Sequence, residues 1–398
     1  MKRILFVDDE SKILDGIRRM MRAERKRWDM HFALGGEAAL QACEAGHFDV
    51  VVSDMRMPGM DGATLLGHIR DRYPCAARIV LSGYADAVLT TRAARVAHRF
   101  LTKPSNASEI QSEIERVFAV QDLMASPEIR AVVGSIDELP SLSRTYVALT
   151  EGVTEPNVSV GRIAEIVEKD IAMAAKILQL VNSAFFGLAQ RVVSLRNALS
   201  CLGMETIRNL ALASETFRVF EPHPGIPGDF YETLQTNARL TAAIAAALPV
   251  DPAIRDVTVV AALLHDVGRL ILASKMPDQF RSILALARER QCPIVAAERE
   301  IVGTSHAEIG AYLLGLWGIP NLAVEAIAYH HNPTGIPHVG FDSSVAVYVA
   351  NLLADELATD ANDTQREELG AADRAFLETL GLLDRLSEFR ELARRTCN

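Results

Sequence analysis

The feature that most constrains this chain is the stretch from Val50 to Gly62, where a short apolar run leads into an acidic residue. The run VVVSD is β-prone and ends at Asp54, and Pro58 and Gly59 then break the chain. This pattern predicts a buried parallel strand with Asp54 at its carboxyl end. In an open parallel sheet the loops at that edge converge on a crevice where ligands bind. Asp54 is therefore the first candidate site residue.

Three further apolar runs end in polar residues: Ile4–Val7 before Asp8 and Asp9, Arg78–Leu81 before Ser82, and Arg99–Leu101 before Thr102 and Lys103. Three carboxylates at one rim would repel one another unless a hard dication lay among them, and Mg²⁺ accepts oxygen ligands of this kind. Helical patterns fill the gaps between the runs, and this alternation favours a parallel sheet. The expected helices are 12–23, 36–45, 63–73, 85–94 and 107–120.

These residues, in this order and spacing, resemble the receiver domain of two-component response regulators over about residues 1–120. The matching stretches are VDDE, SDMRMPGMDG, VLSGYAD and FLTKP. The resemblance implies a flavodoxin-like α/β fold with a parallel five-stranded sheet. It also implies that Asp54 accepts a phosphoryl group from a histidine kinase or phosphotransfer protein.

The same resemblance assigns roles to the other residues of the rim. Asp8, Asp9, Asp54 and the backbone carbonyl of Arg56 would hold Mg²⁺, Ser82 and Lys103 would bind the phosphoryl group, and Phe100 would change rotamer as the switch. The chemistry is consistent with these roles, since a metal can neutralise incoming phosphoryl oxygens and carboxylates form acyl phosphates.

Composition indicates a soluble globular chain of two or more domains, because its 398 residues are 49% hydrophobic and 23% charged. The apolar run near the start is too short for a secretory signal, and no run of 18 apolar residues occurs. Five cysteines without a CxxC pair suit a reducing compartment. We therefore expect a cytoplasmic protein without a membrane segment.

Charge is divided unevenly along the chain. Residues 1–120 hold 18 Lys and Arg against 16 Asp and Glu, a net charge of +2, which leaves −12 for the remainder of a chain of net charge −10. Because affinity for nucleic acid rests largely on cations that neutralise phosphates, we do not expect the acidic part to bind DNA.

After residue 120 the pattern becomes helical. Ser126 and Pro127 resemble a cap and the first residue of a helix, so residues 121–137 are expected to form a linker or short helix. From Leu139 onward the apolar residues recur at helical spacing, which predicts an all-α domain. Residues 194–214 predict two helices about Gly203, and we favour a hairpin over a DNA-reading motif because the segment has few cations.

Histidines mark a second candidate site in the helical part. His265 and Asp266 are adjacent in LLHDVGRLIL, His306 opens an apolar helix, and His330 and His331 occur in YHHNP. Histidines brought from separate helices can complete a metal site. A buried histidine taken alone is more often a satisfied core residue.

These residues resemble the HD superfamily of metal-dependent phosphohydrolases, and the segment from about residue 139 resembles its HDOD (HD-related output) branch. The supporting stretches are ELPSLSRTYVAL, EIVEKDIAMAAKILQLVNSAFFG, SLRNALSCLG and HDVG. Two positions depart from the enzymes, since Thr236 aligns with their first metal histidine and Asn351 with their closing aspartate. Both are weak neutral ligands, so we expect a vestigial site, no metal in this domain and no catalysis.

The predicted order is a receiver at 1–120, a linker at 121–137, an HDOD domain at 138–335 and a helical extension at 336–398, assigned to packing or to a homodimer interface. The favoured function is a response regulator in which the receiver controls a catalytically degenerate HDOD module that binds a protein or nucleotide partner. The alternative is a receiver-regulated phosphohydrolase of a signalling nucleotide, with one metal held by the histidine site.

Overall fold

The computed structural model describes residues 1–82, 96–103, 106–137, 139–141, 143–155, 158–182, 192–212, 218–219, 223–338, 340–360 and 370–397. The chain divides into two compact units, one built mainly on residues 1–138 and the other on most of residues 139–398. The expected helix 85–94 lies outside the described residues, as does most of the polar stretch after residue 360.

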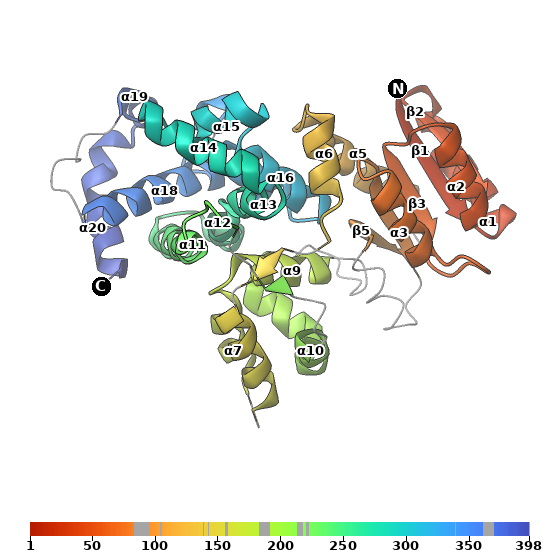
Figure 1. Cartoon of the computed structure of the whole chain (residues 1–398), viewed down its shortest axis with the longest axis horizontal. Coiled ribbons are helices and arrows are strands. Elements are labelled where there is room, and N and C mark those ends of the chain that lie inside the picture. The colour runs from red at the N-terminus through yellow and green to blue at the C-terminus, as the bar shows by residue number, and fades with distance from the viewer. Residues whose placement is uncertain are drawn as a thin grey trace. The chain divides into compact units, whose positions relative to one another are not determined.

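The first unit contains a parallel five-stranded sheet in the order β2-β1-β3-β4-β5 (Figure 1). Its strands are β1 (Lys2–Asp8), β2 (Trp28–Leu34), β3 (Val50–Asp54), β4 (Ala77–Ser82) and β5 (Arg99–Thr102). The central strand β3 is wholly buried, as a strand covered on both faces must be. The flavodoxin-like order expected for this part of the chain is confirmed.

The described helices of the first unit follow the predicted positions closely. They are α1 (Ser11–Met20), α2 (Gly36–Ala45), α3 (Gly62–Arg72), α5 (Ala107–Asp122) and α6 (Pro127–Gly134), with the 3₁₀ helix η1 at Met21–Lys26. Asn106 and Glu109 form a capping box at the start of α5. Ser126 caps α6, and Pro127 occupies its first turn, as the sequence predicts.

The segment predicted as a linker is therefore largely helical and groups with the first unit. Its helix α6 is held by the buried side chain of Arg78 on β4. Nη2 of Arg78 donates to the carbonyl of Gly134 at 2.8 Å and lies 2.8 Å from Nε2 of His98, just before β5. Gly134 packs so closely that an added Cβ would lie 2.1 Å from the carbonyl oxygen of Pro74. Strand β4 and the residue that precedes β5 thus contact α6 directly.

The second unit is helical, apart from a two-residue pairing of β6 (Pro140–Ser141) with β7 (Arg218–Val219) that the sequence did not indicate. Its described helices include α7 (Ser143–Thr154), α8 (Val160–Val167), α9 (Ile171–Asn182), α10 (Leu195–Leu212), α11 (Phe230–Ala247), α12 (Pro252–Leu264), α13 (Val267–Lys275), α14 (Pro277–Arg290), α15 (Ile294–Val302), α16 (His306–Leu316) and α17 (Asn321–Tyr329). They continue with α18 (Ser343–Asp360), α19 (Ala371–Thr379) and α20 (Leu386–Cys397), with 3₁₀ turns at Pro333–Gly335 and Leu383–Arg385.

Two features of the second unit bear on the sequence expectations. The predicted break in residues 194–214 is present, because Gly203 has φ 73° and ψ 153° inside α10. Among the helices after residue 336, α18 and α20 pack against α11. The described residues of this segment therefore group with the helical unit.

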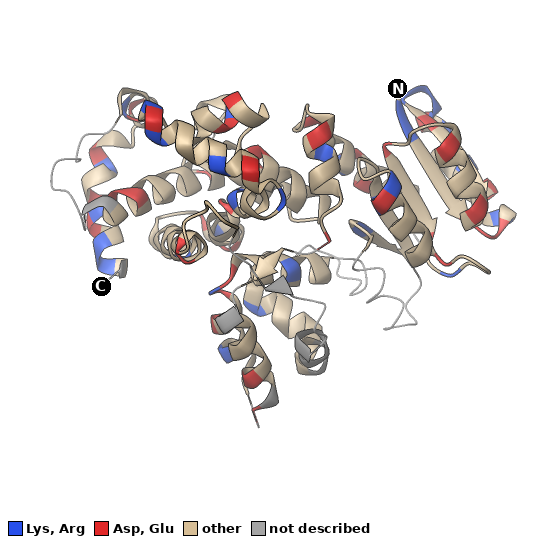
Figure 2. Cartoon of the chain, viewed as in Figure 1, with Lys and Arg blue, Asp and Glu red and all other residues tan. Residues whose placement is uncertain are grey.

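One apolar helical run, Pro252–Lys275, is long enough by length and composition to cross a membrane, but 83% of its apolar window is buried inside the protein. A buried core helix has this pattern. In the described part of the second unit, acidic and basic residues are scattered over the helices between uncharged stretches (Figure 2).

Candidate functional site

The register of the sheet brings the acidic residues of the first unit together. Val7 pairs with Ser53 across β1 and β3, so Asp8 and Asp54 come next to each other at the carboxyl edge. Both are buried, at 1% and 7% exposure. Nζ of Lys103, just after β5, lies 3.0 Å from Oδ2 of Asp8 and also contacts Oδ1 of Asp54. Three residues predicted from separate strands thus converge on one point.

The charge of Lys103 is stabilised in this position. Burial disfavours the ammonium, but the hydrogen bonds to Asp54 and Asp8 outweigh it and raise the pKa of Lys103. One cation nevertheless faces two buried carboxylates. The pocket therefore retains negative charge that a further cation can neutralise.

The loop after β3 holds the Asp54 carboxylate in place. The backbone N–H of Arg56 donates to Oδ2 of Asp54 at 2.8 Å, and the N–H of Gly62 donates to the carbonyl of Met55 at 3.0 Å. Gly62 approaches β3 so closely that a Cβ there would lie 2.1 Å from the carbonyl oxygen of Asp54. A glycine is required at this position.

The structure also places the other predicted residues of the rim. Asp9 is half-buried directly after β1, and among the described residues its side chain makes no hydrogen bond or ion pair. Phe100 is buried in β5 at 8% exposure, paired with Val80 of β4. Ser82 ends β4 and pairs with Thr102, but its side chain lies outside the described residues. The donor set of this rim is composed of carboxylate oxygens, which fit Mg²⁺ better than a transition metal.

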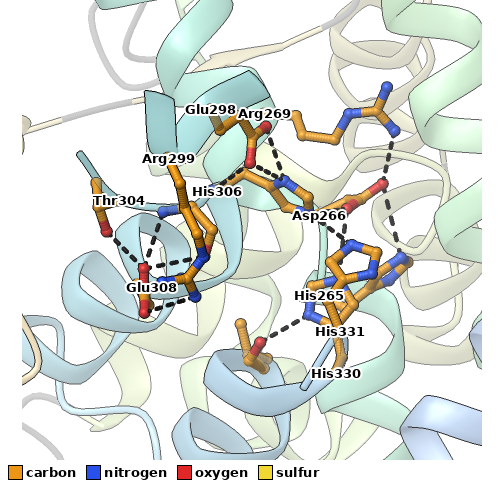
Figure 3. Close-up of polar contacts among 12 residues, drawn as sticks. His265, Asp266, Arg269, Glu298, Arg299, Thr304, His306, Glu308, His330 and His331 are labelled. Carbon is orange, nitrogen blue, oxygen red and sulfur yellow. Dashed lines mark hydrogen bonds and ion pairs between the residues drawn. The ribbon is translucent and has the colours of Figure 1, made fainter. Parts of the chain in front are cut away.

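In the second unit, the apolar run that contains His265 and Asp266 is not one continuous helix, as its pattern predicts, because these two residues lie at a break between α12 and α13. His265 directly follows α12, and Asp266 precedes α13 with φ −96° and ψ 9°, a sparsely populated region of backbone conformation. This break explains how adjacent residues both point into one cluster. Oδ1 of Asp266 lies 3.0 Å from Nε2 of His306 and 3.8 Å from Nε2 of His330 (Figure 3).

Two imidazole rings of this histidine cluster (His265, Asp266, His306, His330 and His331) are fixed in orientation by backbone carbonyls. Nδ1 of His265 lies 2.7 Å from the carbonyl of Ala262, and Nδ1 of His330 lies 2.7 Å from that of Ile327. A carbonyl oxygen can only accept, so Nδ1 carries a hydrogen in both rings. Both Nε2 atoms are buried and without a hydrogen-bond partner, and each lies near a carboxylate oxygen of Asp266, at 3.6 Å for His265 and 3.8 Å for His330. Buried polar atoms of this kind call for a hydrogen-bond partner or a metal.

His306 carries the cluster's positive charge, and its main partner is Glu298 of α15. Nδ1 of His306 lies 2.8 Å from Oε2 of Glu298, and the backbone N–H of His306 donates to the same oxygen at 2.9 Å. Burial disfavours the imidazolium, but Glu298 and Asp266 outweigh it and raise the pKa of His306 to about 9. Glu298 is fully buried, and no motif in the sequence marked it.

The cluster could hold one metal ion. Ligand atoms of Asp266, His306, His330 and His331 all lie within 4.8 Å of one another. Metal-ligating histidines usually donate their second N–H to a carboxylate or backbone carbonyl, and Glu298 together with the two carbonyls supplies such partners. Imidazole with one carboxylate suits Zn, Fe or Mn rather than Mg²⁺. The two residues that align with metal ligands of the HD enzymes would add only weak ligands. Asn351 is buried on α18, and Thr236 lines a separate cavity.

Comparison with known protein families identifies both units. The profile of the response regulator receiver domain matches residues 4–115, and that of the HDOD domain matches residues 139–333. The chain belongs to the two-component response regulators that join a receiver domain to an HDOD domain.

Individual relatives match parts of the chain. An uncharacterised protein of Treponema pallidum is 25% identical over 208 residues, which is 52% of this chain and 40% of that protein. The sensor kinase CckA of Brucella abortus is 34% identical over 123 residues, 30% of this chain and 13% of the kinase. The chain thus spans less than half the length of these curated relatives.

Solved structures include the MmoQ response regulator of Methylococcus capsulatus, with a TM-score of 0.47 and 25% identity over 64% of this chain and 98% of that one. A virulence factor of Campylobacter jejuni has a TM-score of 0.49 and 23% identity, and the match covers 59% of this chain and 84% of that one.

Proposed function

We propose that the protein is a phosphorylation-controlled regulator in the cytoplasm, in which Asp54 accepts a phosphoryl group from a histidine kinase or phosphotransfer protein with Mg²⁺ bound at Asp8, Asp9, Asp54 and the carbonyl of Arg56. The observation that carries the proposal is the shared contact of Lys103 with Asp8 and Asp54 at the carboxyl edge of the sheet. A phosphoryl group adds roughly 1.5 to 2 negative charges, and Lys103 is positioned to pair with them.

We further propose that phosphorylation alters α6. Ser82 would bind the phosphoryl oxygens and Phe100 would change rotamer, so that β4 and β5 shift. Arg78 and His98 connect those strands to Gly134 of α6, which supplies a physical route toward the HDOD domain. The helical module then changes its affinity for a partner, which is a protein or a nucleotide and not DNA.

The test of the phosphoacceptor is incorporation of label from radioactive acetyl phosphate. We expect labelling that requires Mg²⁺ and is lost in Asp54→Asn, while the control Asp61→Asn, which removes the half-buried carboxylate that caps α3, retains it. Labelling that persists in Asp54→Asn would contradict the proposal.

A second candidate function is favoured by one observation, the two orphaned Nε2 atoms of the histidine cluster. They oppose the sequence expectation that the domain binds no metal, and they suit a metal-dependent phosphohydrolase of a signalling nucleotide. Stoichiometric Fe or Mn in the purified protein, with phosphoester turnover abolished in His265→Ala, would establish this function in place of the binding module. Metal without turnover would indicate a structural ion.

A further inference from the structure

The second unit contains a cavity of about 670 Å³ that none of the histidine cluster lines. Its walls are one face of α11 and one face of α12, closed by the residue after α8, the start of α10 and Thr396 of α20. The volume falls within the range of pockets that enclose small organic ligands, about 300–1,000 Å³. The cavity is therefore large enough for a ligand of that class.

The charges at the cavity are mainly positive. Arg196, Arg239 and Arg255 line it together with Glu168 and Asp256, which gives three cations against two anions. This balance stands out because the part of the chain after residue 120 has a net charge of −12. A concave site of this sign attracts anions.

Two of the three guanidinium groups are available to a ligand. Arg255 donates to the carbonyls of Ala246 and Val250, both at 3.2 Å, and is fixed by them. In the described part of the chain, the side chains of Arg196 and Arg239 make no hydrogen bond or ion pair. Burial raises the pKa of Glu168, and the charges of Arg196 and Arg239 only partly offset this rise. Neither guanidinium group is therefore held in an ion pair with the Glu168 carboxylate.

Most of the remaining wall is apolar, and Ser194, Thr236 and Thr396 add hydroxyl groups. Leu240, Val260 and Leu263 line the cavity, and Ala243 and Ala246 provide room because they carry only a methyl group. A ligand with an apolar body and an anionic group at one end matches this lining. Guanidinium groups bind phosphate in a bidentate manner, with better geometry than lysine.

We propose that this cavity binds a small ring-bearing organic phosphate of the nucleoside monophosphate class, with its phosphate on Arg196 and Arg239 and its ring against Leu240, Val260 and Leu263. The inference deepens the proposed function, because it names the ligand of the helical module. It rests on residues distinct from the phosphoacceptor pocket and from the histidine cluster.

Isothermal titration of the full chain with AMP and with GMP tests the proposal. We expect one saturable site for at least one of them, with adenosine and inorganic phosphate each at least about tenfold weaker, since a tenfold change corresponds to the loss of a single good interaction. The variant Arg196→Gln/Arg239→Gln should weaken the nucleotide at least about tenfold. The matched control Arg290→Gln, an exposed residue paired with Glu300 outside the cavity, should bind normally.

A second variant changes the shape of the cavity and leaves its charge unchanged. Ala243→Leu fills the space between the apolar walls and should abolish nucleotide binding, while circular dichroism confirms that the helices remain. Absence of binding by both nucleotides at millimolar concentration, equal binding of inorganic phosphate alone, or binding that none of the cavity variants changes would overturn the proposal. None of these results affects labelling at Asp54, so the two proposals fail separately.

Discussion

Substitution of Gly62 by alanine should damage both the stability of the receiver and its chemistry. A Cβ at this position would lie 2.1 Å from the carbonyl oxygen of Asp54 and 3.1 Å from Cα of Met55. Both neighbours are backbone atoms, so no side-chain rotation relieves the contact. The start of α3 must move away from β3 by nearly an ångström, and the loop that holds the Asp54 carboxylate moves with it.

The size of the effect follows from two opposing contributions. Overpacking of a close-packed interior costs about 1–3 kcal/mol, and the better helix propensity of alanine returns at most about 1 kcal/mol. We expect the free energy of opening of β3 to fall by about 1–2 kcal/mol. A displacement near 1 Å can slow a reaction about 100-fold, so the rate of labelling from acetyl phosphate should fall by up to this factor.

Hydrogen exchange of the β3 amides reports the stability locally, which avoids assigning one unfolding energy to a chain of two units. The control is Gly67→Ala on the same helix, where, among the described residues, an added Cβ meets only Cγ1 of Val96 at 3.8 Å. This variant should be as stable as the wild type or more so, with normal labelling. Equal behaviour of the two variants would refute the close-packing argument.

Three further perturbations probe other parts of the account. Lys103→Met removes the cation between Asp8 and Asp54 and should destabilise the metal-free protein by about 1–3 kcal/mol. Mg²⁺ should then raise the melting temperature of the variant more than that of the wild type. An equal rise in both proteins would argue against Lys103 and Mg²⁺ sharing one pocket. Burial and a neighbouring guanidinium hold the pKa of His98 well below its usual value, so its contribution to stability is present above about pH 6.5 and is lost as the pH falls below it. The protection factors of the β5 amides, which correct for the pH dependence of intrinsic exchange, should therefore fall on acidification, and less steeply in His98→Gln. Gly203→Ala places a side chain at φ 73° and ψ 153°, and no atom of the described residues lies within 4 Å of the added Cβ. Backbone strain alone should therefore lower the free energy of unfolding by about 1–3 kcal/mol, and an unchanged melting temperature would show that the kink relaxes.

Much of the receiver could be predicted because its pattern is local. Each buried strand is a short apolar run, and parallel pairing brings the strand ends to one edge without further information. Asp8, Asp54 and Lys103 therefore converge as expected. The strand β2, WDMHFAL, was not located because it lacks the continuous apolar run that marks the other four strands. As an edge strand, it alternates apolar and polar residues over its first five positions.

The second site was less predictable because its geometry depends on backbone groups. The motif supplied His265, Asp266, His306 and the pair at 330–331, and the structure brings them together. The helix break after His265 has no sequence signature. The same is true of the backbone carbonyls that orient the rings of His265 and His330. Glu298 lies eight residues before its partner on another helix, a separation that no helical or strand periodicity marks. The cavity lined by α11 and α12 likewise depends on how these two helices are oriented in the folded chain, which the pattern of neither helix specifies.

The central claim is that a covalent anion at Asp54 changes the segment leading to the HDOD domain. Hydrogen exchange of the full chain, with and without beryllofluoride as a phosphoryl mimic in the presence of Mg²⁺, tests it directly. The account predicts altered exchange in α6 and in the residues that join it to the helical domain, and no change there in Asp54→Asn. Protection of the loop after β3 with unchanged exchange throughout residues 121–137 would contradict it, since the mimic would then bind without reaching the output half.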